Sequence, residues 1–118
     1  MSNPPNYQGL HVGFRPDSTF RTSFYGNDLT SDATYLETDW NFLVFTYDYN
    51  TKLRSIFRNG IFVKANTSGD KLNSSGNTFY IGSNWDNTRP FHGQLDDVRI
   101  YNKVLTPAEI MGLYGDYK

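Results

Sequence analysis

The feature that most constrains this chain is a two-residue turn between two runs of strand-forming residues. The first run is Leu53 to Phe57, and the second alternates apolar residues from Ile61 to Ala65. Between them stands Arg58-Asn59-Gly60. Asn and Gly tolerate the positive φ angles that a type I′ turn needs at both central positions, and this turn matches the twist of antiparallel strands. The sequence therefore predicts a tight hairpin within an antiparallel sheet.

Two earlier parts of the chain also have strand patterns. Leu10 to Phe14 and Phe20 to Phe24 alternate apolar and polar residues around Pro16-Asp17-Ser18, which predicts another hairpin. The segment Trp40 to Tyr49 has apolar residues at both odd and even positions, as is typical of a strand covered on both faces. We therefore expect this segment in the middle of a sheet, with Trp40 in the core.

The second half predicts two further strands. Phe79 and Ile81 mark a short one, and the last strand runs from about Gln94 to Tyr101, with Val98 and Ile100 on one face.

A short helix follows, and its start is well signalled. Thr106 is the expected N-cap, Pro107 stands at the first helical position, and Glu109 completes a capping box. Leu105 and Ile110 form the apolar pair of a hydrophobic staple. Because Gly112 and Gly115 follow closely, we expect a turn or two.

Size and composition agree with one all-β domain. A chain of 118 residues supports a single core, and its aromatic content of 17% favours strands. We expect an antiparallel jelly-roll or β-sandwich with one short helix near the C-terminus, forming one domain over residues 1–118. Residues 1–7 and 115–118 are predicted to be flexible tails.

Charge and composition make several functions unexpected. The net charge is −1, and Lys and Arg are spread along the chain, so nucleic acid is not an expected partner. The absence of cysteine excludes disulfides and thiolate catalysis. No stretch has the length and apolarity of a membrane span, and the first residues have no signal-peptide pattern, so an export signal would lie outside this sequence.

The segment from Phe91 to Ile110 resembles the closing motif of laminin G-like jelly-roll domains, in the concanavalin A-like superfamily. Thr46-Tyr47-Asp48, the Asn-Gly hairpin and Tyr80-Ile81-Gly82-Ser83 follow the order of such domains. The resemblance covers about Gln8 to Tyr114. It implies a non-catalytic recognition module at the cell surface or outside the cell, which binds a carbohydrate or a protein surface.

The sequence departs from this family at its start, because the family's N-terminal strands have no counterpart here. Removing strands from a sandwich leaves sheet edges and apolar surface uncovered. Two options stay open. The chain forms a smaller, rearranged sandwich, or it is a protomer of a homo-oligomer whose partner supplies the missing edge.

Catalysis is not expected. Retaining glycosidases of this fold use an E-x-D-x-x-E strand with two catalytic carboxylates. The nearest match begins at Glu37 and Asp39, but Phe42 stands where the second Glu is needed. Neither His11 nor His92 has a nucleophile motif beside it.

Polar loops with aromatic residues are the candidate ligand-binding surface. Sugars stack their C–H faces on aromatic rings and hydrogen-bond to amide and charged side chains. The candidate residues are Tyr25, Asn27, Asp28, Trp85, Asp86, Asn87, Arg89 and His92. Trp85 is equally consistent with a packing role that anchors its loop.

The resemblance also implies a structural calcium ion near the closing strand, with Asp96 or Asp97 as a ligand. Asn84 and Asp86 offer further oxygen atoms. In the alternative interpretation, Asp97 pairs with Arg99 or Arg54 and no metal is involved.

Two other functions remain open. The chain could be a structural or assembly subunit that associates through its sandwich edges, or a degenerate enzyme of the glycosidase fold.

Overall fold

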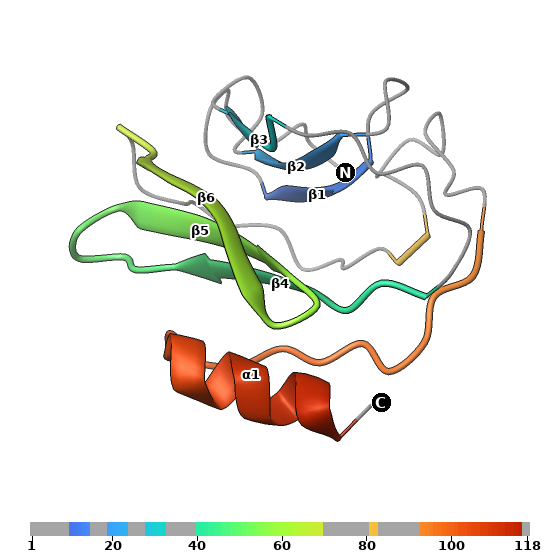
Figure 1. Ribbon diagram of the computed structural model, residues 1–118. Helices are drawn as coiled ribbons and strands as arrows, with labels where there is room; N and C mark the ends of the chain where they lie inside the picture. The colour runs from blue at the N-terminus through green and yellow to red at the C-terminus, as the bar shows by residue number, and fades with distance from the viewer. Residues whose placement is uncertain are drawn as a thin grey trace.

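The computed structural model describes residues 10–14, 19–23, 28–32, 40–69, 81–82 and 93–116. They contain strands β1 (His11–Phe14), β2 (Phe20–Ser23), β3 (Asp28–Thr30), β4 (Leu43–Tyr47), β5 (Leu53–Arg58) and β6 (Ile61–Thr67), and helix α1 (Pro107–Gly115). The strands form two three-stranded antiparallel sheets, ordered β1-β2-β3 and β4-β5-β6. Figure 1 shows three layers, with the second sheet between the first sheet and α1. The predicted all-β sandwich with one short C-terminal helix is confirmed.

The Asn-Gly hairpin is confirmed at the β5–β6 turn. Asn59 and Gly60 have φ angles of 51° and 82°, and Arg58 pairs with Ile61 across the turn. A second constraint on the glycine comes from α1, because a Cβ atom at Gly60 would lie 2.9 Å from the sulfur of Met111. This turn therefore needs glycine both for its backbone angle and for the close approach of the helix.

The first predicted hairpin is also confirmed. β1 and β2 pair antiparallel, with Phe14 opposite Phe20. β3 pairs with the other edge of β2. The side chains of Phe20 in β2 and Leu29 in β3 are buried, and they anchor this sheet.

The prediction that Trp40 to Tyr49 is a central strand is wrong, because β5 occupies the middle of its sheet and β4 lies at an edge. The two faces of β5 are covered by different layers. Phe57 clusters with residues of the α1 region, while Arg54 on the opposite face connects to the first sheet. Trp40 precedes β4 and is 62% exposed, so it is not a core residue. Apolar residues at both odd and even positions indicate that a strand is covered on two faces, but they do not indicate its position in the sheet.

The predicted last strand, Gln94 to Tyr101, is also wrong: this segment is irregular and belongs to neither sheet. Asp97 interrupts it with a φ angle of 53°, and its N–H donates to the Asp96 carboxylate at 2.8 Å. Alternation alone makes no strand, because a strand also needs a neighbour for its backbone hydrogen bonds. Phe79, from the other predicted strand, lies outside the described residues, and Ile81 stands in a bend.

The predicted helix start is confirmed in every part. Thr106 caps α1, Pro107 opens it, and Glu109 completes the capping box. Leu105 and Ile110, the staple pair, are both buried in one cluster with Phe57, as expected for side chains that attach a helix to a sheet.

Helix α1 differs from the prediction in its length. It spans nine residues and continues through Gly112. Gly115 is its last residue and Asp116 is its C-cap, and residues 117–118 of the tail predicted at 115–118 lie outside the described residues. In the described part of the chain, no helix has the length and apolarity to cross a membrane.

Candidate functional site

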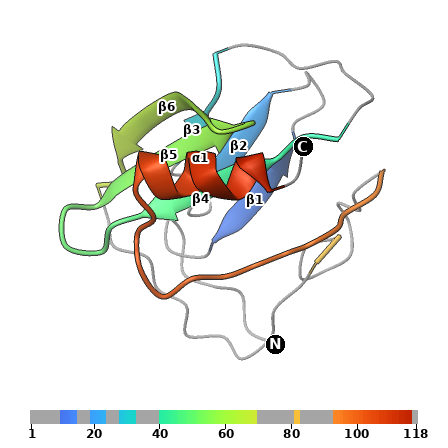
Figure 2. The same cartoon turned by 60° about the horizontal axis from the view of Figure 1, so that its bottom comes forward.

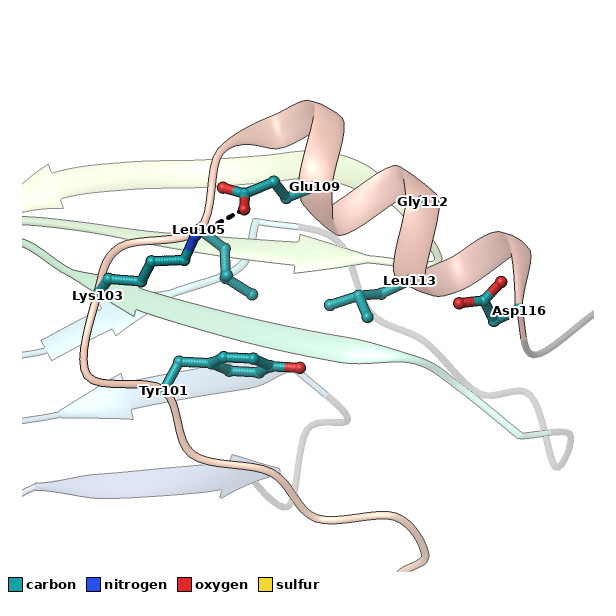
Figure 3. A pocket seen from close by; sticks show the side chains of 7 residues that line it. All are labelled: Tyr101, Lys103, Leu105, Glu109, Gly112, Leu113 and Asp116. Carbon is teal, nitrogen blue, oxygen red and sulfur yellow. Dashed lines mark hydrogen bonds and ion pairs between the residues drawn. The ribbon is translucent and has the colours of Figure 1, made fainter.

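A shallow groove of about 470 Å³, largely open to solvent, lies between α1 and the segment that leads into it. The segment contributes Tyr101, Lys103 and Leu105, and α1 with its C-cap contributes Glu109, Gly112, Leu113 and Asp116. Figure 3 shows the Leu105 and Leu113 side chains pointing toward each other, with the Tyr101 ring below them. In Figure 2 the segment passes beside α1, in the opposite direction, before it turns into the helix.

The groove combines an apolar floor with charged ends. Tyr101 is 43% exposed, so its ring is accessible to a ligand. A Cβ atom at Gly112 would meet nothing within 4 Å, so the helix presents an open side there. Sites for small polar ligands have this composition, with apolar and aromatic walls and a few polar groups that orient the ligand.

Glu109 holds one end of the groove in place. Its carboxylate accepts hydrogen bonds from the Thr106 N–H at 3.0 Å and the Lys103 ammonium at 2.8 Å. The hydrogen bond from Lys103 and the bond from the Thr106 backbone lower the pKa of Glu109 to about 2. These bonds join the segment before the helix to its first turn, at one end of the groove.

The lowered pKa of Glu109 predicts a pH dependence. Because folding lowers the pKa of Glu109, its carboxylate stabilises the folded chain at pH values above its ordinary pKa of 4.5. This contribution is lost as the pH falls through about 2. We expect wild type to be more stable than Glu109→Gln at pH 6, and the difference to disappear toward pH 2. Urea unfolding followed by circular dichroism at several pH values measures this. A difference that stays constant over this range would contradict the assignment.

Asp116 stands at the other end of the groove, in a position that does not favour a carboxylate. The C-terminal end of a helix carries partial negative charge, so an acid there is electrostatically unfavourable. The last turn of α1 contains no basic residue. Residues that break a local rule are often those kept for function.

Most of the ligand-binding residues predicted from the sequence lie outside the described part of the chain. These are Tyr25, Asn27, Trp85, Asp86, Asn87, Arg89 and His92. Their role stays a prediction, and so does the choice between packing and ligand contact for Trp85. The predicted glycosidase-like pair, Glu37 and Asp39, also lies outside it.

Asp28 is described, and its carboxylate takes part in the packing of the first sheet. It pairs with the Arg21 guanidinium and accepts a hydrogen bond from the Ser23 hydroxyl, both on the neighbouring strand β2. The backbone carbonyl of Asp28 accepts from the Asn66 amide of β6 at 3.1 Å. Asp28 therefore connects the two sheets, and a ligand would have to share its carboxylate with Arg21 and Ser23.

This connection continues to Arg54, which is 1% exposed. The Arg54 Nε donates to the side-chain oxygen of Asn66 at 2.7 Å. Burial lowers the pKa of Arg54, while the Asp28 carboxylate and Tyr47 oppose this effect. Arg54, Asn66 and Asp28 form a polar link between the sheets, and the ion pair of Lys64 with Asp32 at 2.6 Å adds a second link nearer the surface.

Asp96 and Asp97, the predicted calcium ligands, lie in the irregular segment before the groove. Both oxygens of Asp97 accept hydrogen bonds from Arg99, at 2.8 and 3.3 Å, as in the alternative interpretation. Among the described residues, no group of three or more His, Cys, Asp or Glu side chains comes together. Asn84 and Asp86 lie outside that part of the chain, so calcium binding stays a prediction.

Sequence reasoning predicts Leu105 and Glu109 at the helix start, but it does not predict the groove. It places Tyr101 in a strand and Asp116 in a tail. The available signal was an acid directly after a short, well-capped helix, where the helix dipole favours a base.

Comparison with known proteins agrees with the architecture. A proposed carbohydrate-binding protein from Bacteroides ovatus matches with a TM-score of 0.74 and 22% identity, over 90% of this chain and 35% of that one. An S-layer domain-containing protein from Clostridium thermocellum matches with a TM-score of 0.56 and 20% identity, over 97% of this chain and 65% of that one. The chain thus spans about a third of the first structure and two thirds of the second. No curated protein matched.

The family model Laminin_G_3, of the concanavalin A-like lectin/glucanases superfamily, matches residues 1–111. This match covers nearly the whole sequence, and the two-sheet architecture with its capped C-terminal helix agrees with it. The chain therefore belongs to the laminin G-type family of the concanavalin A-like lectin/glucanases superfamily.

Proposed function

We propose that this chain is a non-catalytic recognition module that binds carbohydrate, and that the groove beside α1 contributes to binding. The observation that carries the proposal is the accessible Tyr101 ring, which lines the same groove as Leu113 and the Asp116 carboxylate. A sugar presents C–H groups to an aromatic ring and hydroxyl groups to a carboxylate, so it matches both walls. The match to a proposed carbohydrate-binding protein supports this ligand class.

The non-catalytic part of the proposal rests on the carboxylates. The superfamily includes glucanases, whose chemistry in its retaining form needs two carboxylates across the scissile bond. Glu109 is the one glutamate among the described residues, and the helix cap and Lys103 occupy its carboxylate. A low pKa also suits Glu109 poorly to donate a proton to a leaving group.

The proposed setting is the cell surface or the extracellular space. The family and the S-layer match support it. Recognition of a protein surface is the alternative, and a glycan panel tests the two against each other.

The test is binding of the purified chain to a panel of glycans, with and without calcium, followed by affinity measurements on variants. For a glycan that binds, we expect Tyr101→Ala to weaken affinity about tenfold, because the ring's contact with the sugar is lost. Tyr49→Ala is the matched control, since Tyr49 is 55% exposed in the β4–β5 turn, outside the groove. Failure of every glycan to bind, in both conditions, would overturn the proposal.

Two further variants locate the site. Asp116→Asn removes an unfavourable charge, so we expect α1 to gain about 0.3 to 1 kcal/mol while glycan affinity falls. A more stable variant that binds less tightly cannot be explained by misfolding. If only Trp85→Ala weakens binding, and the groove variants bind as wild type does, the predicted loop is the site instead.

A further inference from the structure

Residues 97–100, just before the groove, alternate polar and apolar side chains as a strand does. Residues 95–100 also expose apolar side chains, as a protein interface does. Leu95, Val98 and Ile100 are 51%, 52% and 72% exposed. Neither of the two sheets includes this segment. Contiguous apolar side chains on a protein surface usually mark a contact with a partner, and a segment with strand-forming alternation suits a partner that is itself extended.

The order of charges in this segment is complementary to itself. When two copies of residues 96–100 are aligned antiparallel about Val98, Asp97 of each copy stands opposite Arg99 of the other. Val98 then faces its counterpart, and on the same side of the ladder Ile100 of each copy stands opposite Asp96 of the other and diagonal to its Val98. Opposite charges directly across an antiparallel pair stabilise it, and like charges destabilise it. A two-fold symmetric contact requires such self-complementarity.

The charge pair is already assembled within one chain. Arg99 donates to both oxygens of Asp97, so the two side chains lie on the same side of the backbone, as residues two apart do in a strand. The left-handed φ angle of Asp97 is the feature that departs from a strand. Pairing would return Asp97 to the extended region, which is easier for an L-amino acid to adopt.

We propose that two copies of this chain associate through residues 96–100, which pair as antiparallel strands about Val98. The strand is of ordinary length, and its central apolar contact is the Val98 pair, with Ile100 diagonal to Val98 of the other copy. It ends before Tyr101, so the groove stays open to a ligand. The occupant of this surface is thus a second copy of the chain, held by reciprocal contacts between Asp97 and Arg99.

The first experiment is light scattering coupled to size exclusion over about a hundredfold range of concentration that includes the micromolar region. We expect the mass to rise from 13.6 kDa for one chain to that of a dimer. A mass that stays at 13.6 kDa throughout would overturn the proposal.

The second experiment tests the register with charge variants. Asp97→Arg places arginine opposite arginine, and Arg99→Asp places aspartate opposite aspartate, so each variant alone should be monomeric. Mixed together they should form a heterodimer, since both pairs between positions 97 and 99 are then attractive. Both variants lose the contact between Asp97 and Arg99 within the chain, so recovery on mixing reports a contact between chains. Native mass spectrometry, with a tag on one variant, measures the heterodimer.

Circular dichroism checks that each variant is folded before it is mixed. Dimers that persist in both single variants would show that the copies meet elsewhere, and would overturn the proposal. Two folded monomeric variants that do not associate on mixing would also overturn it.

Discussion

Replacing Arg54 with alanine is expected to destabilise the chain by about 3 kcal/mol, measured as the change in free energy of unfolding in urea. Arg54 is 1% exposed and its Nε donates to Asn66 at 2.7 Å. Its removal leaves the Asn66 oxygen without this donor and takes a positive charge away from the Asp28 carboxylate. It also empties the volume of a long buried side chain. A domain of this size has a total stability of about 5 to 15 kcal/mol, so such a loss is large.

Lys64→Ala is the matched control for Arg54→Ala. Lys64 also pairs with an acid, Asp32, but the two side chains are 38% and 85% exposed, and surface ion pairs contribute about 0 to 1 kcal/mol. A loss below about 1 kcal/mol for Arg54→Ala, similar to the control, would show that the polar link between the sheets is dispensable.

The second large effect is expected for Ile110→Ala, with a loss of about 2 to 5 kcal/mol. Ile110 is fully buried with Leu105 and Phe57, and this cluster attaches α1 to the second sheet. Alanine leaves a cavity at that junction. Because the groove is formed partly by α1, we also expect glycan affinity to fall in this variant. Thermal unfolding and binding to the same glycan measure the two effects.

Met111→Ala, one position along the same helix, separates packing from helix propensity. Met111 is 47% exposed and alanine is a good helix former, so the expected loss is below about 1 kcal/mol. Equal losses for the two variants would contradict the view that Ile110 attaches the helix.

Local structure was predictable wherever hydrogen bonds or steric limits between residues close in the sequence determine it. The turn at Asn59 and Gly60 follows from their tolerance of positive φ angles, and the start of α1 follows from a capping box closed between Thr106 and Glu109. Both involve residues within a few positions of each other. Their energies depend little on the rest of the molecule, so the sequence by itself determined them.

The tertiary structure decided which strand is central, whether the segment at 94–101 joins a sheet, and where a ligand can bind. The position of β5 depends on cover from two separate layers, and the buried Arg54 is tolerated because Asn66 and Asp28 lie on facing strands. The path of the chain around α1 places Tyr101 and Asp116 along the same groove. Such contacts join residues distant in sequence, and alternation and propensity describe only neighbours, so the sequence alone could not place them.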